Sequence, residues 1–168
     1  MPNVGKIIAA HNSKTLSTET STTVQPRSCN CRQPKDCPLN GRCMSSCVVY
    51  KATVTAPGKP TKAYYGLTEG AFKTRYANHQ TSFNRETHIK DTELSKYVWD
   101  LREQGLVGKV QWEIAKRAYP YKCGSRKCDL CLTEKLAIAS ADPTSLLNKR
   151  SEIISTCRHR RKYSCTRL

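Results

Sequence analysis

Several side chains that can act on a phosphodiester recur through the central part of the chain. Tyr50 and Tyr64 fall in two short runs of β-branched and aromatic residues, which predict neighbouring strands. Arg75 and His79 follow in a helical pattern, four residues apart and therefore on one face. A tyrosine held on a strand can position or deprotonate a water, and an arginine matches the geometry of a phosphate. The set predicts chemistry at a phosphate.

A carboxylate that suits a divalent metal comes from a later helical segment. Glu134 lies between Leu130 and Ile138 at four-residue steps, so it shares their otherwise apolar face. A lone carboxylate there is costly unless it is paired or binds a metal, and Mg²⁺ or Mn²⁺ would act as a Lewis acid. His88 and Asn148 are further candidates for the same site.

Each of these residues, taken alone, also has a plainer interpretation. A tyrosine on a strand is more often part of the core than catalytic. Arg75 and His79 could form a solvated helix face, Glu134 could pair with a basic residue, and Asn148 could be a helix N-cap. Their joint spacing favours the chemical interpretation.

Cysteines form two groups whose spacing is typical of metal binding. The first group lies in a loop with no helical or strand period, and four thiolates suit tetrahedral zinc. It comprises Cys29, Cys31, Cys37 and Cys43, with Cys47 as a possible substitute ligand. The second group is predicted to join two C-terminal helices and thereby to hold Glu134 in place. It comprises Cys128, Cys131, Cys157 and His159, while Cys123 could replace a ligand and Cys165 is left over.

The charge of the chain indicates an acidic partner. Its 168 residues carry 29 Lys and Arg against 13 Asp and Glu, a net charge of +16. Such a balance favours nucleic acid, held mainly through its phosphates and with modest sequence preference. The predicted phosphate contacts are Arg126, Lys127, Lys149, Arg150, Arg158, Arg160, Arg161 and Lys162.

The apolar pattern favours a reducing compartment inside the cell. No apolar run reaches the roughly 18 residues of a membrane span, and no secretory signal is visible, so we expect no membrane partner. In a reducing compartment, closely spaced cysteines indicate metal binding more readily than disulfides. A secreted, disulfide-rich basic protein is the alternative, which a count of free thiols would test.

The order of predicted elements indicates an α+β fold. We expect a small, mostly antiparallel three-stranded sheet flanked by helices, with zinc-stabilised cysteine-rich elements. The predicted strands are 48–54, 62–67 and 109–116, the first two forming a hairpin. Helices are predicted from residue 70 through 83, from an N-cap at 91 or 92 to a stop at Gly105, from 129 or 133 to about 142, and from 148 toward 156.

Changes in composition along the chain suggest four segments. Residues 1–28 are rich in Ser and Thr and are predicted to be a flexible linker or arm. Residues 29–47 form a cysteine-rich zinc knuckle, residues 48–157 the main domain, and residues 158–168 a basic tail.

The candidate residues together resemble the GIY-YIG nuclease superfamily. Residues 48–50 (Val-Val-Tyr) resemble its first motif and residues 64–66 (Tyr-Tyr-Gly) its second, and the spacing to the later candidate residues fits as well. The chain departs from the pattern where Val48 and Val49 replace Gly-Ile and where Tyr65 replaces Ile. These are packing positions rather than reacting groups.

The resemblance is closer to one branch of that superfamily. Residues 29–43, 48–52, 93–99, 128–135 and 147–150 are similar to the C-terminal endonuclease domain of Penelope-like and related retroelements. Such a domain follows a reverse transcriptase in a longer polyprotein and cuts target DNA, which leaves a 3′-hydroxyl that primes reverse transcription. The resemblance implies DNA, the reverse transcriptase portion and element RNA as partners, a nuclear location, and 1–28 as the linker from the polymerase.

The resemblance also implies a role for each site residue. Tyr50 would be the general base or water-positioning group, with Tyr64 beside it. Arg75 would hold the scissile phosphate, and Glu134 would be the one protein ligand to Mg²⁺ or Mn²⁺. His79 and His88 would assist proton transfer or phosphate contact, and Asn148 would fix local geometry. Lys51 and Lys73 would be further phosphate contacts. The first cysteine group, without Cys47, would hold zinc. The alternative is a zinc-stabilised nucleic-acid-binding module without catalysis.

Overall fold

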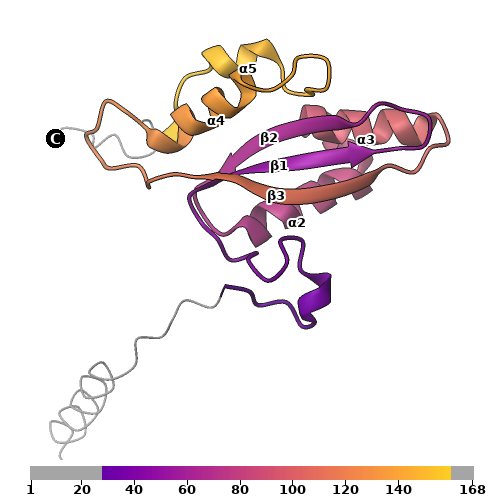
Figure 1. Cartoon of the computed structure of the whole chain (residues 1–168), viewed down its shortest axis with the longest axis horizontal. Coiled ribbons are helices and arrows are strands. Elements are labelled where there is room, and N and C mark those ends of the chain that lie inside the picture. Colours follow the sequence, from indigo (N-terminus) through magenta and orange to yellow (C-terminus); the bar gives the residue numbers. More distant parts are fainter. Residues whose placement is uncertain (1–27, 160–168) are drawn as a thin grey trace, which may run out of the picture.

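A computed structural model describes residues 28–159, and its sheet and helices match the α+β class expected from the sequence. The strands β1 (Val48–Thr55), β2 (Lys62–Thr68) and β3 (Lys109–Arg117) form one antiparallel sheet in the order β2-β1-β3. Figure 1 shows this sheet between two groups of helices. All but the last residue of the predicted arm, residues 1–28, lies outside the described residues, as does most of the predicted basic tail.

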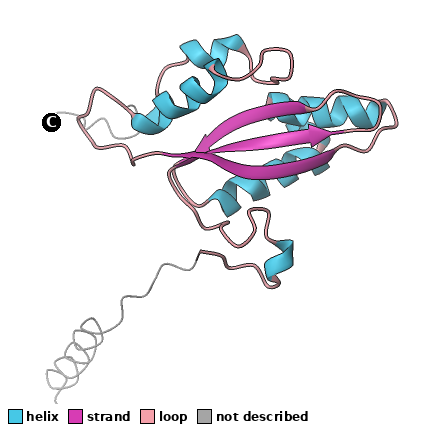
Figure 2. Cartoon of the chain, viewed as in Figure 1, coloured by secondary structure: helices cyan, strands magenta, loops and turns pink. Residues whose placement is uncertain are grey.

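The helices lie on both faces of the sheet, as Figure 2 shows by secondary structure. Helices α2 (Phe72–Asn84) and α3 (Glu93–Glu103) cover one face, joined by the short helix η2 (Glu86–Asp91). Helix α4 (Asp129–Ala139) covers the other face and contacts α5 (Arg150–Ile154). A single turn, η1 (Pro34–Asp36), lies in the cysteine-rich loop.

Local sequence signals explain where these elements begin and end. The Thr92 hydroxyl accepts a hydrogen bond from the Ser95 amide and caps α3, as the N-cap prediction requires. Gly105 adopts a φ of 72° just beyond the end of α3, a conformation that favours glycine. The helix predicted after residue 148 begins only at Arg150, because the Asn148 side chain turns to β2 and does not cap it.

Two apolar cores hold the helices to the sheet. Tyr50, Ala52 and Val54 project toward α2 and α3, where Phe72 and Leu94 are fully buried. On the other face Val49 packs with Leu130 of α4 in a second, smaller cluster. Val48 and Val49 are both fully buried, so these two positions are packing positions in this fold. No helix among residues 28–159 is long and apolar enough to cross a bilayer.

Candidate functional site

Tyr50, Arg75 and His79 form a buried hydrogen-bonded chain between β1 and α2. The Tyr50 hydroxyl lies 2.8 Å from His79 Nε2, and Arg75 Nε donates to the same oxygen over 3.0 Å. Burial lowers the pKa of His79 to about 3, and the Arg75 charge adds to this effect. A neutral imidazole accepts a proton at one ring nitrogen, so Tyr50 accepts from Arg75 and donates its own proton to His79.

Gly66 leaves the space that the Tyr50 hydroxyl occupies. The two residues are cross-strand partners on β1 and β2. A methyl group added at Gly66 would lie 2.6 Å from Tyr50 Cζ, which is closer than atoms pack. The glycine of residues 64–66 is therefore required here by close approach of a side chain, not by a special backbone angle.

Tyr64 and Glu134 complete the site near the outer edge of β2. Tyr64 is buried, its ring lies 6.2 Å from that of His79, and burial raises its pKa well above the usual range. Glu134 projects from α4 toward β2, where it accepts a hydrogen bond from the Leu67 amide. Burial, reinforced by Glu152, raises the pKa of Glu134 to about 7 although Arg75 opposes the rise.

Asn148 joins the C-terminal segment to β2 in the manner of a strand. Its Oδ1 accepts from the Tyr65 amide over 2.7 Å, and its Nδ2 donates to the Tyr65 carbonyl over 2.8 Å. Ala63 makes equivalent backbone bonds to Ser145 and Leu147. The backbone amides and carbonyls of Ala63 and Tyr65, at the outer edge of β2, are thus hydrogen-bonded to this segment. These bonds fix the position of Tyr64 beside Glu134.

Glu152 is a residue of this site that the sequence reasoning missed. It accepts a hydrogen bond from Asn148 Nδ2 over 2.8 Å and interacts electrostatically with Glu134, Tyr50 and Tyr64. The signal available in sequence was its position four residues after Asn148, at the start of a helix. An acidic residue there is more often a capping residue, as its bond to the Lys149 amide also shows.

His88 is not brought into this site. It lies on η2, where its Nδ1 is 2.9 Å from Asp91 Oδ2 and its side chain is partly exposed. None of its described contacts involves Tyr50, Arg75 or Glu134.

The predicted phosphate contacts are spread over several elements, and some of them already have protein partners. Lys51 pairs with Glu113 over 3.1 Å and Lys149 with Glu93 over 2.8 Å, while Lys73 Nζ donates to Asn30. The exposed members of the set are Arg126, Lys127, Lys149, Arg150 and Arg158. Arg160, Arg161 and Lys162 lie outside the described residues.

The first cysteine group has its sulfur atoms close enough to hold zinc. The ligand atoms of Cys29, Cys31, Cys37 and Cys43 all lie within 4.8 Å of one another. The sulfur of Cys43 is 3.5 Å from that of Cys29 and 3.7 Å from that of Cys31. Tetrahedral zinc with bonds of about 2.3 Å spaces sulfurs about 3.8 Å apart, so these four fit it.

Within this group the loop favours the thiolate form at Cys37, whereas burial raises the pKa values of Cys31 and Cys43. Burial opposes ionisation of Cys37, but the amides of Leu39 and Gly41 point at its sulfur and lower its pKa to about 6. Cys47 is not part of the group, because its sulfur contacts the Glu69 carbonyl instead.

The second group likewise brings its four ligand atoms together, in a set of three cysteines and one histidine. His159 Nδ1 lies 3.4 Å from the Cys128 sulfur and 3.2 Å from that of Cys131, whose sulfur is 3.5 Å from Cys157. Zinc with three sulfurs and one nitrogen requires such distances. The group fastens the first turn of α4 to the segment after α5, and Glu134 lies one turn further along α4.

The remaining cysteines lie outside both groups or outside the description. Cys123 is exposed and does not join the second group, and Cys165 lies beyond the described residues. None of the nine described cysteines is in a disulfide.

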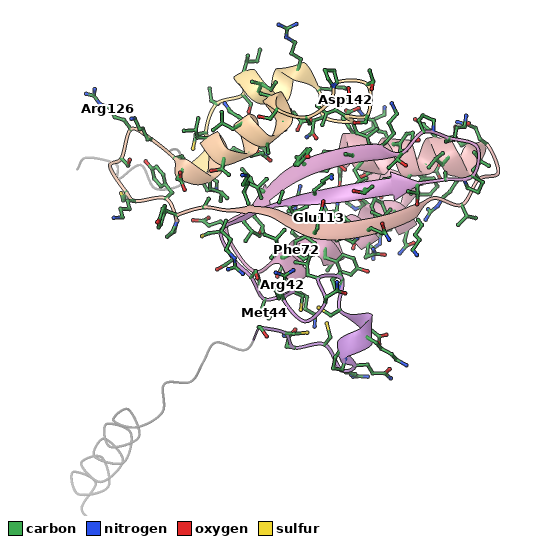
Figure 3. All side chains as sticks on the ribbon, viewed as in Figure 1. Arg42, Met44, Phe72, Glu113, Arg126 and Asp142 are labelled. Atoms are coloured by element: carbon green, nitrogen blue, oxygen red, sulfur yellow. The ribbon has the colours of Figure 1, made fainter. Side chains whose placement is uncertain are left out.

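Figure 3 shows how densely side chains fill the space between the sheet and both groups of helices.

The chain was compared with protein-family models, with curated proteins and with solved structures, and none of them matches it.

Proposed function

We propose that the chain is a divalent-metal-dependent DNA endonuclease of the GIY-YIG type. The single observation that supports this most strongly is the chain of hydrogen bonds from Arg75 through the Tyr50 hydroxyl to His79, with Tyr64 and Glu134 beside it. A structural core has little use for a half-buried arginine, a neutral histidine and a carboxylate around one tyrosine, because each costs desolvation. A phosphodiesterase uses all of them.

In this proposal Tyr50 passes a proton from water to His79. His79 Nε2 accepts the phenol proton while the phenol oxygen takes a proton from the attacking water, and Arg75 stabilises the charge that develops on oxygen. The water oxygen forms a bond to phosphorus as the bond from phosphorus to O3′ breaks. The products are a 5′-phosphate and the 3′-hydroxyl, whose oxygen takes its proton from a solvent water.

Glu134 fits a magnesium or manganese ion. Mg²⁺ is commonly held by one or two carboxylates together with water and substrate phosphate, so a single glutamate is a sufficient protein contribution. When bound there, the ion would act as a Lewis acid on the phosphate. Burial raises the pKa of Glu134 to about 7, and a divalent cation bound beside it would favour the charged carboxylate.

The two cysteine groups would hold structural zinc, because protein ligands fill all four positions of each. The similarity to Penelope-like retroelements extends the proposal to a biological role. The domain would nick target DNA in the nucleus to provide a primer for reverse transcription, next to a reverse transcriptase and element RNA.

Plasmid cleavage tests this function. Supercoiled DNA is incubated with the full chain and Mg²⁺ or Mn²⁺, alongside Glu134→Gln and Arg75→Ala, with zinc content and circular dichroism measured on the same samples. We expect the wild type to relax the plasmid. Both folded variants should relax it at least about a hundredfold more slowly. His88→Gln is the matched control and should cut like the wild type.

One result would replace the proposal by its alternative. If wild type and variants bind DNA alike and none cuts it with either metal, the chain is a zinc-stabilised nucleic-acid-binding module.

A further inference from the structure

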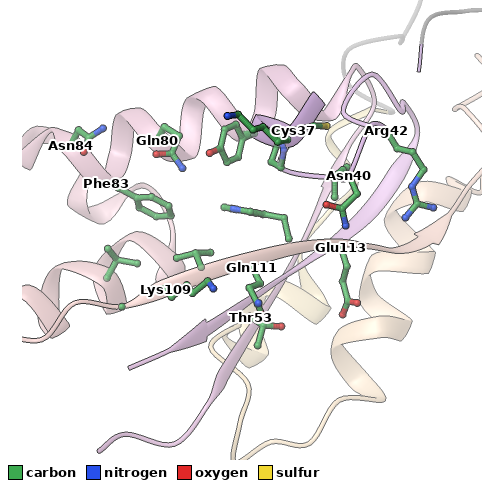
Figure 4. A pocket seen from close by; sticks show the side chains of 18 of the residues that line it. Cys37, Asn40, Arg42, Thr53, Gln80, Phe83, Asn84, Lys109, Gln111 and Glu113 are labelled. Carbon is green, nitrogen blue, oxygen red and sulfur yellow. The ribbon is translucent and has the colours of Figure 1, made fainter. Parts of the chain in front are cut away.

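A groove of about 1000 Å³ lies on the β3 side of the sheet, away from the bonded edge of β2. It runs between the cysteine-rich loop, α2 and β3, and Figure 4 shows the side chains that surround it. Among the described residues no strand pairs with the outer edge of β3. The lining of the groove does not include Tyr50, Arg75 or Glu134.

Flat aromatic and amide side chains line this groove. Tyr76 of α2 and Trp112 of β3 are half-buried, with ring centroids 5.7 Å apart, so part of each ring faces the groove. Asn40 and Gln80 contribute carboxamides from the cysteine-rich loop and from α2. Aromatic rings stack on nucleobases, and carboxamides donate to and accept from base edges.

The charges of the groove are mostly positive. Lys35, Arg42 and Lys109 are exposed, and none belongs to an ion pair within residues 28–159. The acidic residue of the lining, Glu113, is paired with Lys51. Arg102 is already engaged, since it donates to the Phe83 carbonyl and stacks on the Trp99 ring.

We propose that this groove binds single-stranded nucleic acid. Lys35, Arg42 and Lys109 would contact phosphates while Tyr76 and Trp112 stack on bases. A duplex hides the faces of its bases, so only an unpaired strand can use these rings. The alternative occupant is a protein strand added to the edge of β3. Its backbone would bond to that edge, but it would not account for the unpaired cations and the carboxamides.

The groove is separated from the candidate nuclease site by one layer of rings. The Trp112 ring lies 5.2 Å from that of His79 and 5.9 Å from that of Tyr50. A strand stacked on Trp112 would therefore lie behind the Tyr50 and His79 pair. Binding in the groove needs no cleavage, so it is tested separately from the nuclease activity.

Fluorescence of Trp112 reports on this binding directly. Trp99→Phe leaves Trp112 as the one remaining tryptophan of two. This full chain, zinc-loaded and without Mg²⁺ or Mn²⁺, is titrated with thymidine and uridine oligomers of about ten nucleotides and with a duplex of equal length. The groove variant is Arg42→Ala with Lys109→Ala, and the charge-matched control is Lys59→Ala with Lys90→Ala, two exposed lysines outside the groove lining and outside the predicted phosphate contacts, both in the same background.

We expect saturable quenching by the single strands and roughly a tenfold loss of affinity in the groove variant, against less than about twofold in the control. The two oligomers distinguish DNA from RNA as the bound strand, and quenching by either supports the proposal. Absence of quenching, equal quenching by the duplex, or equal losses in both variants would overturn it. Plasmid cleavage by the same proteins is scored independently, so failure of one proposal is not failure of the other.

Discussion

At the scale of single residues, the candidate site depends on how closely Tyr50 approaches β2. Its hydroxyl is held between Arg75 and His79, and its ring lies against the α-carbon of Gly66. The side chain cannot move away without breaking one of these bonds. The position of the hydroxyl is thus fixed by packing on one side and by hydrogen bonds on the other.

Gly66→Ala tests this packing. The added methyl group would overlap Tyr50 Cζ, so we expect a loss of about 1 to 3 kcal/mol in unfolding free energy, together with loss of plasmid cleavage. Urea denaturation measures the first effect. Gly70→Ala is the matched control, because nothing lies within 4 Å of a methyl group there and its backbone angle is ordinary. Equal stability of the two variants would contradict the assigned approach.

His79 gives a prediction for pH. Its pKa is depressed from 6.5 to about 3 in the folded chain, so the unfolded chain binds the extra proton between these values. Stability from the neutral imidazole is complete above about pH 6.5 and falls as pH decreases toward 3. At pH 5 the loss relative to pH 8 amounts to about 2 kcal/mol.

His79→Gln isolates this contribution, because its carboxamide oxygen can still accept from Tyr50. Wild type and variant are compared by urea denaturation at pH 8 and pH 5. Glu134, whose raised pKa acts in the opposite direction over the same range, is present in both proteins and cancels. The variant should lose less stability than the wild type on acidification, and parallel curves would contradict the burial of a neutral His79.

The sequence predicted the residues that share one element better than those that meet across elements. The shared face of Arg75 and His79 follows from helical spacing alone. The pairing of Asn148 with Tyr65 spans 83 residues and uses a side chain as a strand, which no local pattern indicates. Glu152 reaches the site through that same pairing, and it was missed for the same reason.

At the scale of elements, the second cysteine group decides where α4 lies. Cys128 precedes α4 and Cys131 lies in its first turn, while Cys157 and His159 follow α5. Beside this group, Leu130 of α4 packs with Val49 of β1, and Glu134 bonds to the Leu67 amide of β2. The sequence predicted the pair formed by Cys128 and Cys131 from its spacing. That Cys157 and His159, 26 and 28 residues after Cys131, complete the group became clear only from the fold.

Cys131→Ser should therefore separate zinc from the catalytic metal. We expect zinc content to fall from two ions to one per chain and plasmid cleavage to drop by at least about tenfold, because Glu134 loses its support. Mass spectrometry under native conditions counts the ions. Cys47→Ser, outside both groups, should retain two zinc ions and full cleavage. Retention of both ions by Cys131→Ser would show that this group does not bind zinc.

At the scale of the whole molecule, the two edges of the sheet differ. The outer edge of β2 is bonded to residues 145–148 and carries the candidate nuclease site, while the β3 side is hollowed into a groove. A net charge of +16 surrounds both. Long-range attraction should therefore bring nucleic acid to the molecule. In our proposals, the β2 edge would then cleave it and the groove beside β3 would bind an unpaired strand.

Salt dependence measures how far this attraction governs binding. If about six phosphates are contacted, affinity for duplex DNA should fall by about a thousandfold between roughly 50 and 200 mM salt. Fluorescence anisotropy without Mg²⁺ or Mn²⁺ gives the slope, and removing Lys127 and Arg150 together should reduce its magnitude by about two, one for each phosphate contact. Lys59→Ala with Lys90→Ala, exposed positions outside the predicted contacts, should leave the slope unchanged. A slope near zero would mean that the charge of the chain is a solvated surface, and the case for a nucleic-acid partner would then depend on the groove and the candidate site alone.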